Sequence, residues 1–186
     1  MTNTQSLRLF PNGTLHRVIE IALGEVGTVE EGDNLTKYGK AFNVDGLPWC
    51  GSFCNWVFRE AGVKIPPVIA TAQGAHSFKD LGKWHESPKA GDLAFMDFPH
   101  DGVDRISHVG IVIKVAQNSI TTIEGNTSGT GNQRNGGMVM IKTRALGTGS
   151  PVVGFGRCRF AEFDGDLPVI IETVITPKKK IGRIKK

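Results

Sequence analysis

Two residues in this sequence have the types and the placement for thiol chemistry. Cys50 follows Gly-Leu-Pro-Trp at the start of a predicted helix. A free thiol has a pKa of about 8.5, and a helix N-terminus beside an imidazolium lowers it by several units. His108 lies on the β-branched run 107–112, which predicts a strand that can hold a base rigidly. We therefore expect a Cys50 thiolate and a His108 imidazolium that meet across an open groove.

A third group is needed to orient the imidazole. Glu124 and Asn126 end the next predicted strand. They are two residues apart on extended backbone, so they should point the same way, and either can accept a hydrogen bond from the His108 ring. Period-two alternation also places Gly110 on the face of His108, where it would leave space beside the imidazole.

An ordered set of short motifs resembles the CHAP domain, the cysteine- and histidine-dependent amidohydrolase/peptidase. The set is Pro48-Trp49-Cys50, Gly91-Asp92-Leu93, Ser107-His108-Val109-Gly110-Ile111-Val112 and Glu124-Gly125-Asn126. The resemblance implies a papain-like α+β fold and cleavage of an amide bond in peptidoglycan. It implies that Cys50 is the nucleophile, His108 the base, and Glu124 with Asn126 the orienting pair.

Two further comparisons with that family concern its phage-encoded members and its calcium loop. The segment 34–39 resembles the stretch ahead of the cysteine in phage-encoded members. The alternating aspartates of the calcium loop are not matched, since Glu31, Asp33 and Asn34 form only a fragment of it. We therefore expect no metal and no cofactor.

The surrounding pattern predicts helices first and strands afterwards. Helices are expected over 15–26, 36–42, 49–61 and 71–83, and strands over 92–98, 108–115, 119–124, 138–144 and 152–159. This order indicates an α+β fold, with N-terminal helices packed on an antiparallel sheet of about five strands joined mainly by hairpins. We expect an N-terminal extension over 1–13, the catalytic domain over 14–163, and a linker with a basic tail over 164–186. Residues 169–175 could add a strand.

Composition and charge exclude several classes of protein. The chain has 186 residues and no apolar run of the ~18 residues needed to cross a bilayer. Its first ten residues lack a secretory signal, so synthesis in a host cytoplasm and action at the cell wall are expected. The last ten residues hold six positive charges; subtracting these from the net +4 leaves −2 for residues 1–176. This tail could bind an anionic wall polymer, whereas no pattern of specific nucleic-acid recognition is present.

Several residues have more than one reading. Cys50 could be a small buried hydrophobe, or a zinc ligand with Cys54 and Cys158, although three cysteines with this spacing fit neither a zinc site nor a disulfide framework well. Tyr38 could support the oxyanion or only pack in the core, and Trp49 could form the floor of a substrate cleft.

Other polar residues are assigned to the surface or to the rim of the cleft. His16 is expected on the solvated face of its helix, and His76, His85 and His100 on the surface, with His100 a candidate to line the cleft. The glycine-rich stretch 127–137 predicts a long hairpin loop at the cleft edge that could touch the glycan or stem peptide.

The function expected from these features is peptidoglycan hydrolysis by a phage lysin. N-acetylmuramoyl-L-alanine amidase and peptide endopeptidase activities both remain open, as do an endolysin and a virion-associated lysin. The alternative is a non-catalytic phage structural or wall-binding module that retains the fold; an amidase acting on a small amide is a third reading. The sequence does not specify the oligomeric state.

Overall fold

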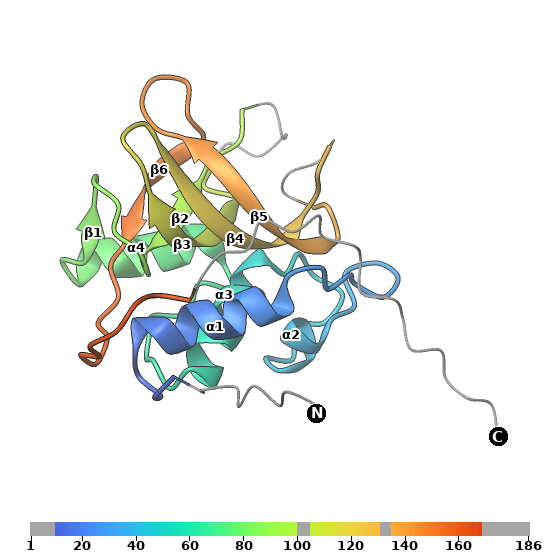
Figure 1. Ribbon diagram of the computed structural model, residues 1–186. Helices are drawn as coiled ribbons and strands as arrows, with labels where there is room; N and C mark the ends of the chain where they lie inside the picture. Colours follow the sequence, from blue (N-terminus) through green and yellow to red (C-terminus); the bar gives the residue numbers. More distant parts are fainter. Residues whose placement is uncertain (1–9, 100–104, 131–134, 169–186) are drawn as a thin grey trace, which may run out of the picture.

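The computed structural model describes residues 10–99, 105–130 and 135–168. Within these residues the chain forms helices first and strands afterwards (Figure 1). The helices are α1 (Leu15–Glu25), α2 (Lys37–Lys40), α3 (Cys50–Glu60) and α4 (Thr71–Asp80). The strands are β1 (Trp84–His85), β2 (Leu93–Met96), β3 (His108–Val115), β4 (Ser119–Thr127), β5 (Met138–Ala145) and β6 (Val152–Gly156).

Hydroxyl caps define the starts of the first two helices. The Thr14 hydroxyl accepts a hydrogen bond from the backbone N–H of Arg17, and the Thr36 hydroxyl accepts one from Gly39. Each cap satisfies a backbone donor that the first helical turn leaves without an intrahelical partner. Trp49, the residue before α3, makes no such side-chain bond. The N-terminal turn of α3 is therefore open to another group.

One antiparallel sheet contains all six strands, in the order β1-β6-β2-β3-β4-β5. Strands β2 to β5 follow one another through hairpin connections, and β6 then returns to lie between β1 and β2. The register pairs Met96 with His108 and Glu124 with Met140. The pairing shifts between Glu124 and Thr127, which marks an irregularity at the end of β4.

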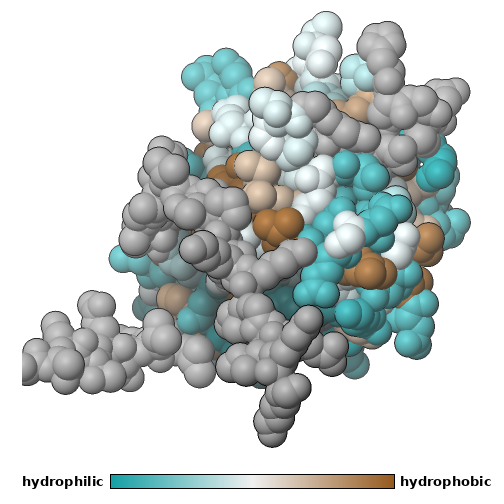
Figure 2. Space-filling view, turned by 90° about the vertical axis from the view of Figure 1, so that its right-hand side faces the viewer, coloured by the Kyte–Doolittle hydropathy of each residue, from teal (hydrophilic) through white to brown (hydrophobic). Residues whose placement is uncertain are grey.

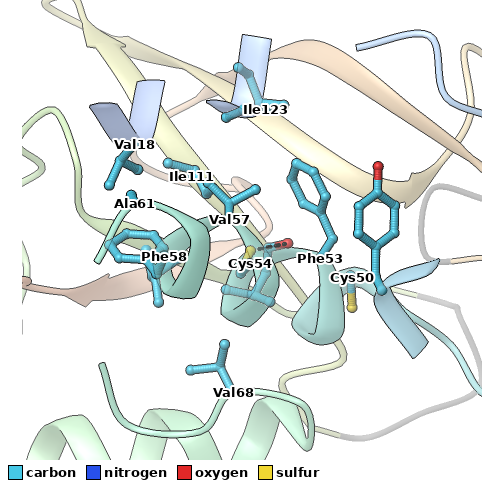
Figure 3. Close-up of a cluster of buried hydrophobic side chains, with 14 of the residues drawn as sticks. Val18, Cys50, Phe53, Cys54, Val57, Phe58, Ala61, Val68, Ile111 and Ile123 are labelled. Carbon is cyan, nitrogen blue, oxygen red and sulfur yellow. Dashed lines mark hydrogen bonds between the residues drawn. The ribbon is translucent and has the colours of Figure 1, made fainter. Parts of the chain in front are cut away.

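The helices lie together on one side of the sheet (Figure 1). The main core forms between them and the sheet face that carries Leu93, Phe95, Val109, Ile111 and Ile123. Figure 3 shows side chains of α3 in this core beside Ile111 and Ile123 of the sheet. The opposite face holds a smaller apolar cluster, which consists of Ala94, Met96, Val112, Ile120 and Phe155 with Phe98, Leu146 and Val152 at its margin. The catalytic candidates on the sheet belong to this second face.

The expected α+β, papain-like fold class is confirmed: a helix that begins at the cysteine packs against an antiparallel sheet that carries the histidine. The sheet has six strands where about five were expected. The additional strand, β1, has only two residues and no alternating pattern, so His85 lies in a strand and not in a loop. The strand expected over 152–159 ends earlier, at Gly156.

The two ends of the described chain lie against each other. The backbone N–H of Ala161 donates to the carbonyl of Gly13, at 2.8 Å. His16 is only 7% exposed: its ring contacts Phe163 and its Nε2 lies 2.8 Å from the carbonyl oxygen of Gly165. The expectation of a solvated His16 is therefore wrong, because these later residues cover it. The proposed domain boundaries stay a prediction, and residues 169–186 lie outside the description.

The surface shows no broad apolar patch on the described part of the face in Figure 2, where hydrophobic residues are scattered among hydrophilic ones. Among the helices of the described residues, none is long and apolar enough to span a membrane.

Candidate active site

Cys50 is the first residue of α3 (Figure 3). The N–H groups of the first helical turn have no intrahelical acceptor, and the helix dipole places partial positive charge there. Figure 3 shows the sulfur directed away from Phe53, which enters the core. Gly51 lets the backbone of Val68 approach this turn closely, since a Cβ at position 51 would overlap the Val68 carbonyl oxygen. The expected placement of the cysteine at a helix start is confirmed.

His108 is the first residue of β3 and is fully buried. Its Nε2 lies 3.0 Å from Oε2 of Glu124. Its Nδ1 is buried and makes no hydrogen bond to a nitrogen or oxygen atom of the described residues. The ring of Phe98 lies 5.6 Å from the imidazole, centroid to centroid. The ring is thus held through one nitrogen, and the other is left for the cysteine.

The Cys50 thiol and the His108 imidazole shift each other's pKa through charge and hydrogen bonding. Burial raises the pKa of Cys50, but the charge and hydrogen bonding of His108 outweigh burial and bring that pKa below its ordinary value. Burial lowers the pKa of His108, whereas the Cys50 thiolate, and after it Glu124, raise it to about 9. These opposite shifts favour the ion pair of a thiolate and an imidazolium at neutral pH.

Glu124 accepts hydrogen bonds from several elements at once. It is fully buried, and Oε1 accepts a bond of 2.6 Å from the Thr122 hydroxyl. Arg144 of β5 binds both oxygens, with Nε 2.9 Å from Oε1 and Nη2 2.5 Å from Oε2. Burial raises the pKa of this carboxyl, but Arg144 and then His108 reverse the effect and hold the pKa at about 2. Glu124 is therefore ionised beside His108.

Gly110 makes room for Glu124 and not, as expected, for the imidazole. A Cβ on Gly110 would lie 2.6 Å from Cγ of Glu124 and 3.4 Å from its Cδ. The reason is the pairing of β3 with β4, which sets position 110 against the acidic side chain.

Asn126 does not make the contact expected of it. Its backbone φ is +56°, in the left-handed region that asparagine tolerates better than most residues. Its Nδ2 donates to Oδ1 of Asn135, and its Oδ1 accepts from the backbone N–H of Gly137 at 3.3 Å. The shifted pairing after Glu124 breaks the alternation that would have aligned the two side chains. Asn126 therefore ties together the ends of the 127–137 loop, and Glu124 alone of the pair holds His108.

Trp49 was expected to form the floor of a substrate cleft, and Tyr38 either to support the oxyanion or to pack in the core; both side chains are fully buried, which agrees with the packing role for Tyr38. The two rings stack at a centroid distance of 5.3 Å. The Tyr38 hydroxyl donates to Glu25 and the Trp49 indole N–H to Glu30, so both polar atoms are engaged inside the fold. Both rings therefore belong to the core beside the start of α3, and Tyr38 also packs against Phe53.

Arg144 is a site residue that the sequence reasoning missed. A signal was present: alternation on the predicted strand 138–144 places Lys142 and Arg144 on one face, next to the strand that carries Glu124. Two basic residues on one face, beside a buried acid, indicate a charge partner.

The Gly91-Asp92-Leu93 motif leads into β2 and lies away from Cys50. Asp92 is buried, and Arg157 binds it through Nε at 3.2 Å and Nη2 at 2.9 Å. This pair joins the start of β2 to the residue after β6. It resembles the Arg144–Glu124 pair in chemistry but makes no contact with Cys50, His108 or Glu124 among the described residues.

The other two cysteines differ from Cys50. Cys54 is fully buried one turn further along α3, and burial raises its thiol pKa well above the ordinary value. Burial also raises the pKa of Cys158. The described residues contain no cluster of three or more histidine, cysteine or acidic side chains placed to hold a metal ion.

The expected open groove is not seen at the two reacting residues. Cys50 is 3% exposed and His108 is not exposed at all. The first turn of α3 is covered by the chain around Val68 and by its contact with β3. The expected cleft candidates His100 and most of the tip of the 127–137 loop, residues 131–134, lie outside the description.

A family model agrees with the sequence resemblance. Residues 42–126 match the family model of the CHAP domain, and this confirms the resemblance for the part of the chain that contains Cys50, His108 and Glu124. No curated protein matches. A solved structure from Staphylococcus aureus subsp. aureus Mu50, described as similar to a lipoprotein of the NLP/P60 family, is 18% identical with a TM-score of 0.46. The match covers 86% of this chain and 46% of that chain, so this chain spans less than half of its length.

Proposed function

We propose that this chain is a cysteine-dependent hydrolase that cleaves an amide bond of bacterial peptidoglycan. The observation that carries the proposal is the arrangement of Cys50, His108 and Glu124. The cysteine is the first residue of a helix, and the histidine is held by Glu124 through Nε2. The match to the CHAP domain supports the substrate class.

In the first half of the reaction the Cys50 thiolate attacks the amide carbonyl carbon, and a carbon–sulfur bond forms. The proton on His108 passes to the departing nitrogen as the carbon–nitrogen bond breaks. The first product, an amine, leaves, and the acyl group remains on sulfur. A protonated His108 is required at this step, which agrees with a pKa of about 9.

In the second half water replaces the amine. His108, now neutral, takes a proton from the water as its oxygen bonds to the acyl carbon, and the carbon–sulfur bond breaks. The carboxylic acid leaves, and the thiolate–imidazolium pair is restored. Backbone N–H groups at the start of α3, that of Cys50 first, are the proposed donors to the oxyanion formed in each half. Glu124 keeps the ring in place throughout.

The test is hydrolysis of purified bacterial walls, followed as loss of turbidity. Cys50→Ala should abolish the activity and leave the circular dichroism spectrum and melting temperature close to those of the unchanged chain. Cys54→Ala is the matched control: it removes a thiol from the same helix, one turn away, and should retain most activity. Full activity of Cys50→Ala would reject the proposal and favour a non-catalytic wall-binding module.

The cleaved bond and the biological source are finer proposals. We propose N-acetylmuramoyl-L-alanine amidase or peptide endopeptidase activity in a phage lysin, a source supported by the resemblance of segment 34–39 to phage-encoded members. Mass spectrometry of digested peptidoglycan decides the bond. A free amino terminus on L-alanine indicates the amidase, and one within the peptide or cross-bridge indicates the endopeptidase.

The basic tail is the proposed contact with anionic wall polymers. Its six positive charges lie within residues 177–186. Deleting this segment should weaken wall binding at low salt more than it reduces cleavage of soluble fragments. Equal salt-dependent binding with and without the tail would show that the proposed contact is wrong.

A further inference from the structure

We propose that Arg144 is a positioning residue of this site: it fixes the Glu124 carboxylate in its ionised form, so that Glu124 can hold His108 in the orientation that stabilises the Cys50 thiolate. The inference rests on the proposed function, because it assigns Arg144 a part in the same thiol chemistry.

The first support is the geometry of the pair. Arg144 binds both carboxylate oxygens, Nε to Oε1 at 2.9 Å and Nη2 to Oε2 at 2.5 Å. A two-point contact of a planar guanidinium defines the plane of a carboxylate, which a lysine ammonium cannot do. Oε2, one of the atoms so held, is also the atom that faces Nε2 of His108. The orientation of the imidazole therefore depends on the guanidinium through one shared oxygen.

The second support is the packing around the guanidinium. Arg144 is buried, and its Cζ lies 5.1 Å from the centroid of the Phe98 ring. The same ring lies 5.6 Å from the imidazole of His108. Phe98 therefore contacts both cations, and Thr122 adds a hydroxyl bond to the carboxylate between them. The rigid surroundings hold Arg144 in the bonded orientation.

The third support is the order in which charged groups follow one another in space. The thiolate, imidazolium, carboxylate and guanidinium alternate in sign along Cys50, His108, Glu124 and Arg144, all of them buried. The charged and titratable groups that interact with Glu124 in the described structure are Cys54 of α3, His108 of β3, and Lys142 and Arg144 of β5.

The effect of Glu124 reaches α3, since its charge contributes to the raised pKa of Cys54. Lys142 does not take the place of Arg144: its Nζ donates to the carbonyl of Ser128 at 2.7 Å.

Loss of the Arg144 guanidinium should destabilise the Cys50 thiolate in two ways. Burial then raises the pKa of Glu124, because the largest opposing interaction is gone, and at acidic pH the protonated carboxyl no longer supports the imidazolium. Where Glu124 stays ionised, it has lost the two-point contact that fixes its carboxylate, so the imidazole is held less firmly in the orientation that stabilises the Cys50 thiolate. Both effects move the onset of thiolate reactivity to higher pH.

The experiment measures the pH at which Cys50 of the full chain becomes half-maximally reactive toward iodoacetamide, read by mass spectrometry of the Cys50 peptide. Arg144→Gln should raise this pH by about one unit, equivalent to about tenfold slower alkylation on the acidic side. Arg144→Lys should give a smaller rise, because it keeps the charge but not the two-point contact.

Arg157→Gln is the matched control. Arg157 binds Asp92 through the same two nitrogens, at the ends of strands β6 and β2 of the same sheet and away from the cysteine. The Arg157→Gln substitution should lower the melting temperature and leave the pH profile of Cys50 alkylation unchanged. An Arg144→Gln protein that is destabilised like Arg157→Gln, with an unmoved pH profile, would overturn the inference and make Arg144 purely structural.

A double variant keeps the test decisive if Arg144→Gln does not fold. The change Glu124→Gln removes the charge that Arg144 balances, so adding Arg144→Gln to it should shift the Cys50 profile no further. A further shift in the double variant would contradict the inference. An unchanged chain whose Cys50 already behaves as an ordinary thiol would contradict the proposed function instead, which separates the two failures.

Discussion

His108 and Glu124 meet at a single pair of atoms, Nε2 and Oε2, separated by 3.0 Å in the buried interior. This contact determines which ring nitrogen is left over. Because Nε2 is engaged by the acid, Nδ1 is the nitrogen available to the Cys50 sulfur. Against the effect of burial, His108 lowers the pKa of the Cys50 thiol, and the thiolate raises the pKa of His108. The direction of proton transfer in the proposed reaction follows from this arrangement.

Replacing Glu124 should weaken catalysis without abolishing it. Glu124→Gln keeps the shape of the side chain but loses the charge that raises the pKa of His108. The imidazolium then loses its proton at lower pH, and the ring is held less firmly. We expect kcat to fall about 10- to 100-fold, less than the ~10²–10⁴-fold contribution of a complete general acid–base residue because His108 remains, with less than about a twofold change in KM. Steady-state kinetics on a soluble wall fragment measure both.

The activity of the unchanged chain should fall on the alkaline side near pH 9. His108 must carry a proton to release the amine, and its pKa is about 9. In Glu124→Gln the alkaline limb should move to lower pH, because the raised pKa depends in part on Glu124. A pH–rate profile of both proteins checks this. An alkaline limb that is the same in the two proteins would show that Glu124 does not act through His108.

A methyl group at position 110 should displace Glu124. The added Cβ would lie 2.6 Å from Cγ of the acid, closer than non-bonded carbons approach. We expect Gly110→Ala to reduce kcat about tenfold or more and to cost about 1–3 kcal/mol of stability, as overpacking does. Gly24→Ala, in α1, is the control. Its Cβ meets nothing within 4 Å, so activity should be unchanged and stability equal or slightly higher. Urea unfolding and kinetics report both quantities.

The sequence predicted the parts of the fold that local patterns control. Apolar spacing placed α1 and α3 within about a residue of their ends, and the β-branched run 108–115 coincides with β3. Non-local pairing was not predictable in this way. The return of β6 between β1 and β2 is determined by packing between distant segments, and the two-residue β1 has too short a pattern to detect.

In the candidate site, too, contacts between distant segments could not be predicted from local patterns. Cys50, His108 and Glu124 could be identified because each ends or begins a strongly patterned element. The misassigned residues depend on contacts with other segments: Tyr38 and Trp49 are buried because Glu25 and Glu30 bind their polar atoms, and Asn126 turns away where the pairing of β4 shifts. Arg144 becomes a site residue only when β5 lies beside β4.

Acid should remove a part of the stability that Glu124 contributes. The pKa of Glu124 falls from an ordinary 4.5 to about 2 in the folded protein. A lowered pKa gives stability that is fully present above the ordinary value and is lost as pH falls through the folded value. The difference in unfolding free energy between the unchanged chain and Glu124→Gln should therefore shrink between pH 4.5 and pH 2. Urea unfolding at several pH values measures it, and a difference that stays constant over this range would contradict the ionised, buried state of Glu124.

The most direct measurement of the central claim is the pH dependence of Cys50 alkylation in the native chain, compared with Cys54 and Cys158 in the same digest. The thiolate–imidazolium pair predicts that Cys50 reacts selectively and well below pH 8, and that His108→Ala abolishes this low-pH reactivity. A Cys50 that reacts only as its ordinary thiol deprotonates near pH 8.5, or with no preference over the other two cysteines, would contradict the account.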